Sequence, residues 1–191
     1  MRFLEPLVLC AILSIATAAH AASVTVGSGN AAGVVTVDGV IDGGDDQKLA
    51  AALSQVAASG KKPIVMLDSR GGDVDVSMAM GRIIRQSGAA TYHRYCASAC
   101  VYAFLGGTQR FVNKDSGAGV LNVHRPEAAE AYVHNPTPTA KGMLDMLKNY
   151  TVEMIGNPAF FDAMMNIPFQ TPHALGPQEA MQMQVATGVA R

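Results

Sequence analysis

The chain of 191 residues has no tryptophan, only three cysteines, and few charged side chains, which make up 15% of its residues. So few cysteines exclude a scaffold of many disulfides, and no second Cys/His pair has the spacing of a structural zinc site. The formal net charge of −1 gives no attraction to nucleic acid or to an anionic membrane surface. We therefore expect no metal and no nucleic-acid partner.

Long apolar runs are also scarce, and the one near the start has the pattern of a secretory signal peptide over residues 1–22. Arg2 gives a short basic start, residues 7–19 are mostly apolar, and Ala-His-Ala at 19–21 is an A-x-A sequence. The apolar run is too short to cross a bilayer comfortably, which disfavours a membrane anchor, and no later run is long enough either. We expect cleavage near Ala21 or Ala22 and an exported mature chain, periplasmic or secreted.

The remaining chain is long enough for one domain with a sizeable core, which we place at residues 34–189. Hydrophobic residues make up 49% of the sequence, which excludes a disordered chain. A β-branched run at 34–41 predicts a strand, and the apolar run at 63–68 predicts a strand buried on both faces. Leu49, Leu53 and Val56 have the spacing of a helix with one apolar face.

Strand and helix patterns continue to alternate up to Pro126. Further strands are predicted at 90–95, 109–112 and 119–124, with helices near 76–83 and 101–105. This alternation predicts an α/β fold with a parallel sheet and right-handed crossovers. After Pro126 we expect a polar loop or lid at 127–138, then a tail of helices at 141–155, at 159–165 and from Pro177 onward.

Three short segments that could carry chemistry each follow a predicted strand, at residues 68–72 (DSRGG), 96–100 (CASAC) and 119–126 (GVLNVHRP). In open α/β sheets the ligand crevice lies beyond the carboxyl ends of the strands. Each segment also has a purely structural explanation: a Gly-Gly turn, a helix-capping serine and a hydrogen-bonded histidine. Taken singly, these explanations are the more common ones, so the stronger signal is the order of the three segments.

Two cysteines remain in the mature chain, because Cys10 leaves with the signal peptide. Cys96 and Cys100 flank Ser98, and an exported protein meets oxidising conditions. A four-residue separation inside one helix gives poor disulfide geometry, so a bridge works better if Cys96 lies before the helix. A disulfide and two buried thiols both remain open.

The order of the three segments resembles that of the proteolytic subunit of the Clp protease and its exported relatives, within the Clp/crotonase superfamily. SRGG at 69–72 is similar to the family's S-P-G-G turn, ASA at 97–99 to its A-S-M turn, and NVHRP at 122–126 to its M-I-H-Q-P segment. The resemblance covers residues 34–126, with fainter similarity over 141–189. Arg70 replaces the family's proline, and is either solvated or available to a substrate carboxylate.

The resemblance implies a Clp/crotonase-like spiral of ββα units with a C-terminal helical tail. It implies Ser98 as nucleophile and His124 as general base, with the N–H groups of Gly72 and Ala99 as the oxyanion hole and Gly71 shaping the turn. It also implies a peptide or acyl substrate, assembly into a homo-oligomer, and no cofactor.

The third member of the family's catalytic triad is missing. Its aspartate aligns with residues 171–173 (TPH), none of which is a carboxylate. Asp162 upstream, Asn122 or a backbone carbonyl could orient His124 instead. A Ser–His dyad, an altered triad and an inactive relative therefore all remain open.

These observations leave three classes of function. The leading hypothesis is an exported, peptidase-like serine hydrolase of the Clp protease type. The second is a non-catalytic binding or assembly protein that retains the fold, which the missing aspartate supports. The third is a crotonase-like acyl-thioester enzyme, which export disfavours because coenzyme A is mainly cytoplasmic. A Ser–Lys mechanism through Lys114 has no motif support.

Overall fold

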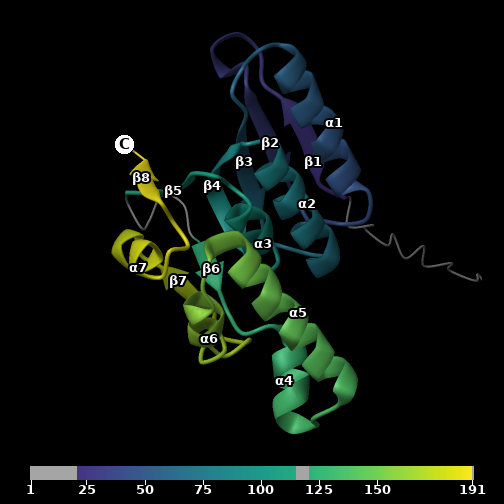
Figure 1. The fold of residues 1–191 in the computed structure, drawn as a ribbon, viewed down its shortest axis with the longest axis vertical. Coiled ribbons are helices and arrows are strands. Elements are labelled where there is room, and N and C mark those ends of the chain that lie inside the picture. Colours follow the sequence, from purple (N-terminus) through teal and green to yellow (C-terminus); the bar gives the residue numbers. More distant parts are fainter. Residues whose placement is uncertain (1–20, 115–120, 191) are drawn as a thin grey trace, which may run out of the picture.

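The computed structural model describes residues 21–114 and 121–190 (Figure 1). Residues 1–20 of the predicted signal peptide, with Cys10, lie outside these ranges, and so do Gly119 and Val120 of the third predicted segment. The strands are β1 (Ser23–Val26), β2 (Val34–Asp38), β3 (Ile64–Ser69), β4 (Ala90–Ala97), β5 (Arg110–Asn113), β6 (Leu121–Val123), β7 (His173–Leu175) and β8 (Gly188–Ala190). The helices are α1 (Asp45–Ala58), α2 (Val74–Gln86), α3 (Cys100–Leu105), α4 (Glu127–His134), α5 (Pro138–Ile155), α6 (Ala159–Met164) and α7 (Pro177–Gln182), with a short 3₁₀ turn at Gly29–Ala31.

The strands form one mixed sheet in the order β1-β2-β3-β4-β5-β8, and β6 pairs with both β4 and β7. Neighbours from β2 to β8 run parallel, as do β4 and β6, whereas β1 is antiparallel to β2 and β7 to β6. Helices α1, α2 and α3 connect successive parallel strands that all step in one direction across the sheet. Right-handed crossovers therefore place the three helices on one face, with α2 packed between the other two. The predicted α/β fold with its largely parallel sheet is confirmed.

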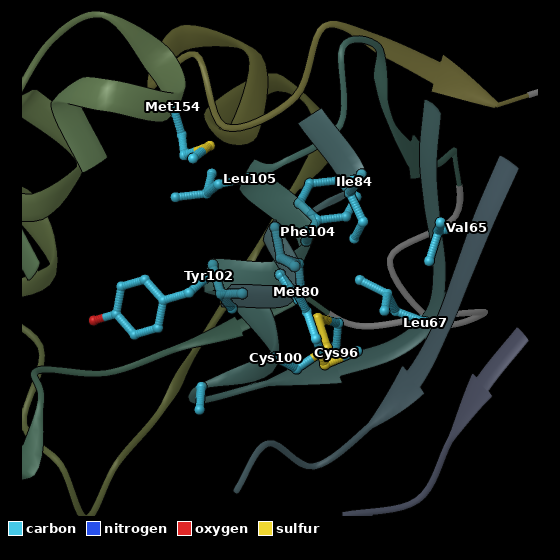
Figure 2. Packing of buried hydrophobic residues seen from close by; sticks show 14 of the residues in the cluster. Val65, Leu67, Met80, Ile84, Cys96, Cys100, Tyr102, Phe104, Leu105 and Met154 are labelled. Atoms are coloured by element: carbon cyan, nitrogen blue, oxygen red, sulfur yellow. A yellow bond between two sulfur atoms is a disulfide. The ribbon is translucent and has the colours of Figure 1, made fainter. Parts of the chain in front are cut away.

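The core lies between this helical layer and the sheet. Val65 and Leu67 of β3 are fully buried, and Figure 2 shows them near Met80 and Ile84 of α2. Ile64, on the opposite face of β3, is 40% exposed. The expectation that this strand is buried on both faces is therefore wrong, because the face of β3 that carries Ile64, Met66 and Asp68 is only partly covered.

The predicted loop at 127–138 is also wrong, because its first eight residues form helix α4. α4 packs against α5, and the two helices project together from the body of the sheet (Figure 1). Pro138 occupies the first turn of α5, where its missing N–H removes no intrahelical bond. The Thr137 hydroxyl caps the same helix by accepting a hydrogen bond of 3.1 Å from the Ala140 N–H.

The C-terminal tail contains the expected helices α5, α6 and α7, but it also contributes β7 and β8 to the sheet, which the helical-tail prediction omitted. Buried Arg110 of β5 holds the segment that precedes β8. Its guanidinium donates hydrogen bonds to the carbonyl groups of Gly107, Gln184 and Val185. In the described part of the chain no helix is both long and apolar enough to span a bilayer.

Candidate active site

The three segments predicted to carry chemistry meet at one edge of the sheet. β3 pairs with β4 through Ser69 and Cys96, and β4 pairs with β6 through Ala97 and Asn122. Because all three strands are parallel, the residues that follow them emerge side by side. They open onto a cavity of about 660 Å³ whose lining includes Gly72, Ser98, Ala99 and His124.

Ser98 lies at the apex of a sharp turn from β4 into α3. Its φ of +54° is in the left-handed region, which costs a residue with a side chain about 1–2 kcal/mol. The Ser98 N–H donates to the Asn122 carbonyl at 3.2 Å, and the Ser98 carbonyl accepts from the Val101 N–H at 3.0 Å. The strained turn is thus held from β6 and from α3, and backbone strain of this kind concentrates at functional sites.

A disulfide between Cys96 and Cys100 closes this turn. Cys96 belongs to β4 and Cys100 is the first residue of α3, so the bridge joins a strand to a helix and does not lie within one helix. Both residues are fully buried, and Figure 2 shows the bond among the buried side chains of the core. Of the two alternatives for these cysteines, the structure contains the disulfide.

The His124 ring is oriented by the backbone. Its Nδ1 lies 2.8 Å from the carbonyl oxygen of Arg125. A carbonyl can only accept a hydrogen bond, so Nδ1 carries the proton and the neutral ring keeps Nε2 as an acceptor. The ring also packs edge-on against Phe169, with centroids 4.7 Å apart. A base with an available Nε2 is what a neighbouring hydroxyl needs for activation.

A network around Arg125 holds this carbonyl in place. The Arg125 N–H donates to the Ile167 carbonyl at 2.8 Å, and its Nε lies 3.7 Å from a Glu130 carboxylate oxygen. The same oxygen accepts a hydrogen bond of 3.1 Å from the Phe169 N–H. Sequence reasoning missed Glu130 and Phe169, because neither belongs to a motif and their contacts arise only when α4 folds against the 166–170 segment.

Two backbone N–H groups, those of Gly72 and Ala99, have no acceptor among the described residues. Ile41 bonds to both neighbours of Gly72, donating to the Gly71 carbonyl and accepting from the Asp73 N–H, each at 2.9 Å. The Gly72 N–H takes no part in these two hydrogen bonds. Both it and Ala99 line the cavity, so their amides are available to a ligand oxygen.

Neither glycine of this turn has room for a side chain. A Cβ on Gly71 would lie 2.9 Å from the Ala99 nitrogen, and one on Gly72 would lie 2.1 Å from the Ile41 carbonyl oxygen. Their φ angles, +96° and +141°, are also unfavourable for any other residue. The Gly-Gly turn therefore packs directly against the Ser98 turn.

The other candidate residues lie elsewhere. The Asn122 side chain donates to the Tyr95 hydroxyl at 3.3 Å, and Asp162 of α6 pairs with Lys148 at 2.8 Å on the exposed surface. Neither has a described contact with His124. Lys114 is not among the residues that line the cavity, and Arg70 lines a second, smaller cavity.

The lining of the cavity is largely apolar, and its charged residues are acidic. The apolar lining comes mainly from α3, α5 and the segments around them: Val101, Tyr102, Val123, Met143, Leu147, Met164 and Phe169. The charged lining consists of Asp73, Asp75 and Glu127, with no lysine or arginine among the described lining residues. Within residues 21–114 and 121–190 no three His, Cys, Asp or Glu side chains are grouped to hold a metal ion.

Comparison with known proteins gives a structural match alone. No family model matches the sequence, and no curated protein matches it significantly. Among solved structures, the fold is similar to ClpP1 from Listeria monocytogenes, with a TM-score of 0.63 and 15% identity, and to a point mutant of that protein, with a TM-score of 0.65 and 16% identity. Each match covers 83% of this chain and 91% of the other. The chain therefore has a Clp protease-like α/β fold.

Proposed function

We propose that this chain is a serine hydrolase that cleaves peptides or another acyl substrate outside the cytoplasm. One observation carries the proposal: a serine on a strained turn, a histidine with an available Nε2 and two backbone amides without a described acceptor line the same cavity. Each group is weak evidence alone. Together they supply the nucleophile, the base and the oxyanion donors that acyl transfer requires.

In the proposed reaction, Nε2 of His124 takes the proton from Ser98 Oγ while the oxygen attacks the substrate carbonyl carbon. The carbonyl oxygen becomes an oxyanion that accepts hydrogen bonds from the Gly72 and Ala99 N–H groups. The tetrahedral intermediate expels the leaving group, to which His124 returns the proton. Water, deprotonated by the same histidine, then hydrolyses the acyl-enzyme and restores Ser98.

The Arg125 carbonyl takes the place of a triad aspartate. It fixes the same tautomer, but as a dipole it stabilises the imidazolium less than a full negative charge does. Replacing a triad aspartate lowers turnover by about 10⁴ while leaving residual catalysis. We therefore expect a slow hydrolase, for which covalent labelling is a better assay than turnover.

Labelling with a fluorophosphonate probe tests the proposal. We expect the wild-type chain to be labelled, Ser98→Ala to be unlabelled, and His124→Gln to be labelled at least tenfold more slowly. Ser54→Ala on the exposed side of α1 is the matched control and should be labelled like the wild type. Labelling of Ser98→Ala at the wild-type rate would remove Ser98 from the mechanism.

A non-catalytic binding or assembly protein is the second candidate. The observation in its favour is that the Ser98 hydroxyl forms no hydrogen bond with His124 or any other described residue. Catalytic hydrogen bonds are often long in ligand-free enzymes, so the absence of this bond does not exclude His124 as the base for Ser98. A folded wild-type chain that resists the probe at every pH from 6 to 9 would favour this second function.

An acyl-thioester enzyme fits the cavity less well. Coenzyme A carries several phosphate charges, whereas the charged side chains that line the cavity are the carboxylates Asp73, Asp75 and Glu127. These carboxylates would repel the phosphate groups of coenzyme A. Measurable affinity for coenzyme A would revive this class.

We also propose that the chain self-associates. Helix α5 exposes Met143, Met146 and Val152, apolar side chains of the kind that contact other subunits. Light scattering on the mature chain should give a mass that is a multiple of the monomer. A monomeric mass at the highest soluble concentration would contradict this part of the proposal.

A further inference from the structure

A buried carboxylate lies where the chain enters the fold. Asp45, the first residue of α1, is fully buried. Its Oδ2 accepts hydrogen bonds from the Ala22 and Asp42 N–H groups, both at 2.9 Å, and its Oδ1 lies 2.7 Å from Lys48 Nζ. Lys48 also donates to the Ala22 carbonyl at 3.3 Å. Asp45 therefore ties α1 to the residue that precedes β1.

This buried carboxylate is paired with one cation, the ammonium group of Lys48. A buried ion is stable when it is paired and hydrogen-bonded, and the Lys48 side chain that pairs with Asp45 is 48% exposed to solvent. The other carboxylate oxygen, Oδ2, accepts a hydrogen bond from the Ala22 nitrogen. A protonated amine at that position would form a charge-assisted hydrogen bond, which is about twice as strong as that of an amide N–H.

Ala22 is also the residue that follows the A-x-A sequence at 19–21. We propose that the chain is cut between Ala21 and Ala22, and that the new α-ammonium group of Ala22 pairs with Asp45. Water hydrolyses the Ala21–Ala22 peptide bond, so Ala21 leaves with a carboxylate and the released Ala22 amine takes up a proton. The inference rests on the proposed export and is independent of hydrolase activity.

The structure distinguishes this cut from its neighbours. Ala22 is 1% exposed and belongs to the core, so a cut after it would remove a buried methyl group along with a hydrogen bond to Asp45. A cut before Ala21 would leave an amide opposite Asp45. Only hydrolysis of the Ala21–Ala22 bond keeps the packing of Ala22 and adds a positive charge beside the carboxylate.

The first test is the N-terminus itself. The full chain is expressed in a host with an export pathway, and the purified protein is analysed by intact mass and N-terminal sequencing. We expect a chain that starts at Ala22. A purified protein that starts elsewhere, or that keeps residues 1–21, overturns the inference, whereas the proposed catalytic role of Ser98 is decided separately by the labelling test.

The second test measures the ion pair. The melting temperature is compared for a chain that starts at Ala22 and one with Gly-Ser added before Ala22, each with and without Asp45→Asn. We expect the added residues to lower the melting temperature by several degrees with Asp45 present, and by much less with Asp45→Asn. Asp46→Asn, which changes the same charge in the same helical turn, should keep the difference between the two N-termini. Equal effects of Asp45→Asn on both chains overturn the inference.

A pH series keeps the test decisive if Asp45→Asn does not fold. A paired α-amino group has a raised pKa, so its contribution is present below the ordinary pKa of about 8 and is lost as pH rises through the raised value. The charged groups around it are Asp42, Asp45, Asp46 and Lys48, with Asp38 across from Ser23 on β2. Between pH 7 and 10 the Ala22-start chain should lose more stability than the extended chain, and parallel curves contradict the ion pair.

Discussion

Gly72 contributes backbone to the site. Gly72 lines the cavity, and its N–H has no described acceptor, whereas Ile41 bonds to the backbone groups of Gly71 and Asp73 on either side of it. The same contact leaves no space for a side chain, since a Cβ would lie 2.1 Å from the Ile41 carbonyl oxygen. A side chain at this position must therefore displace the amide that is proposed to bind the oxyanion.

Gly72→Ala tests this close contact. We expect the rate of fluorophosphonate labelling to fall by at least tenfold, because loss of one oxyanion donor typically lowers turnover by about 10²–10³. Gly43→Ala is the control, since a Cβ on Gly43 meets no atom within 4 Å. Rates measured for both folded variants decide the matter, and equal rates for Gly72→Ala and wild type would show that this amide has no role.

For single residues, the sequence was informative about Ser98, His124, Gly71 and Gly72, because each belongs to a motif that follows a strand. Of the alternatives for orienting His124, the structure contains the backbone carbonyl, that of Arg125. The sequence did not identify which residue supplies it, because residue type cannot reveal a backbone group, and it was not informative about Glu130 or Phe169. Phe169 reaches the His124 ring only through the path of the chain between α6 and β7.

At the level of secondary-structure elements, the turn between β4 and α3 determines the geometry of the site. It is held by the disulfide at its base and by the hydrogen bond from the Ser98 N–H to Asn122 on β6. The disulfide closes a short loop, and a loop of this size stabilises a fold by about 2 kcal/mol through the unfolded state. Its removal should therefore affect both stability and the serine.

We expect reduction of Cys96–Cys100 to lower the free energy of unfolding by about 2 kcal/mol and to slow labelling of Ser98 severalfold, because Ser98 holds a strained φ that the bridge supports. Urea unfolding and labelling, each with and without reductant, measure the two effects. The Cys96→Ala/Cys100→Ala double variant is the control, in which reductant should change nothing. Unchanged labelling of the reduced wild type would mean that the hydrogen bonds of Ser98 to β6 and α3 hold the turn without the disulfide.

The sequence pattern predicted the elements from β2 to β5 well, because their apolar residues repeat with the period of a strand or a helix. It predicted the later chain less well. The prolines at 136 and 138 indicated a loop, although one of them starts α5 and α4 precedes both. Strands β7 and β8 have three residues each, which is too few for any alternation to be visible.

For the molecule as a whole, we expect one buried histidine to make stability depend on acid. His93 of β4 is 1% exposed, packs against Phe104, and has no hydrogen-bond partner on either ring nitrogen among the described residues. Burial lowers the pKa of His93 from its ordinary 6.5 to about 4. The unfolded chain therefore binds a proton below pH 6.5 that the folded chain does not.

The stability that neutral His93 contributes is present above pH 6.5 and is lost as the pH falls to 4. We expect the free energy of unfolding to decrease by about 3 kcal/mol over this interval. Urea unfolding at pH 7, 5.5 and 4.5 measures the slope. It should flatten in His93→Leu and persist in His134→Gln, whose side chain is 81% exposed. A wild-type slope in His93→Leu would assign the acid response to other groups.

The most direct measurement is the crystal structure of the chain after reaction with a fluorophosphonate. We expect phosphorus bonded to Ser98 Oγ, its oxygen within hydrogen-bonding distance of the Gly72 and Ala99 N–H groups, and Nε2 of His124 facing the adduct. An adduct on another residue, or a phosphonyl oxygen turned away from both amides, would contradict the proposed site.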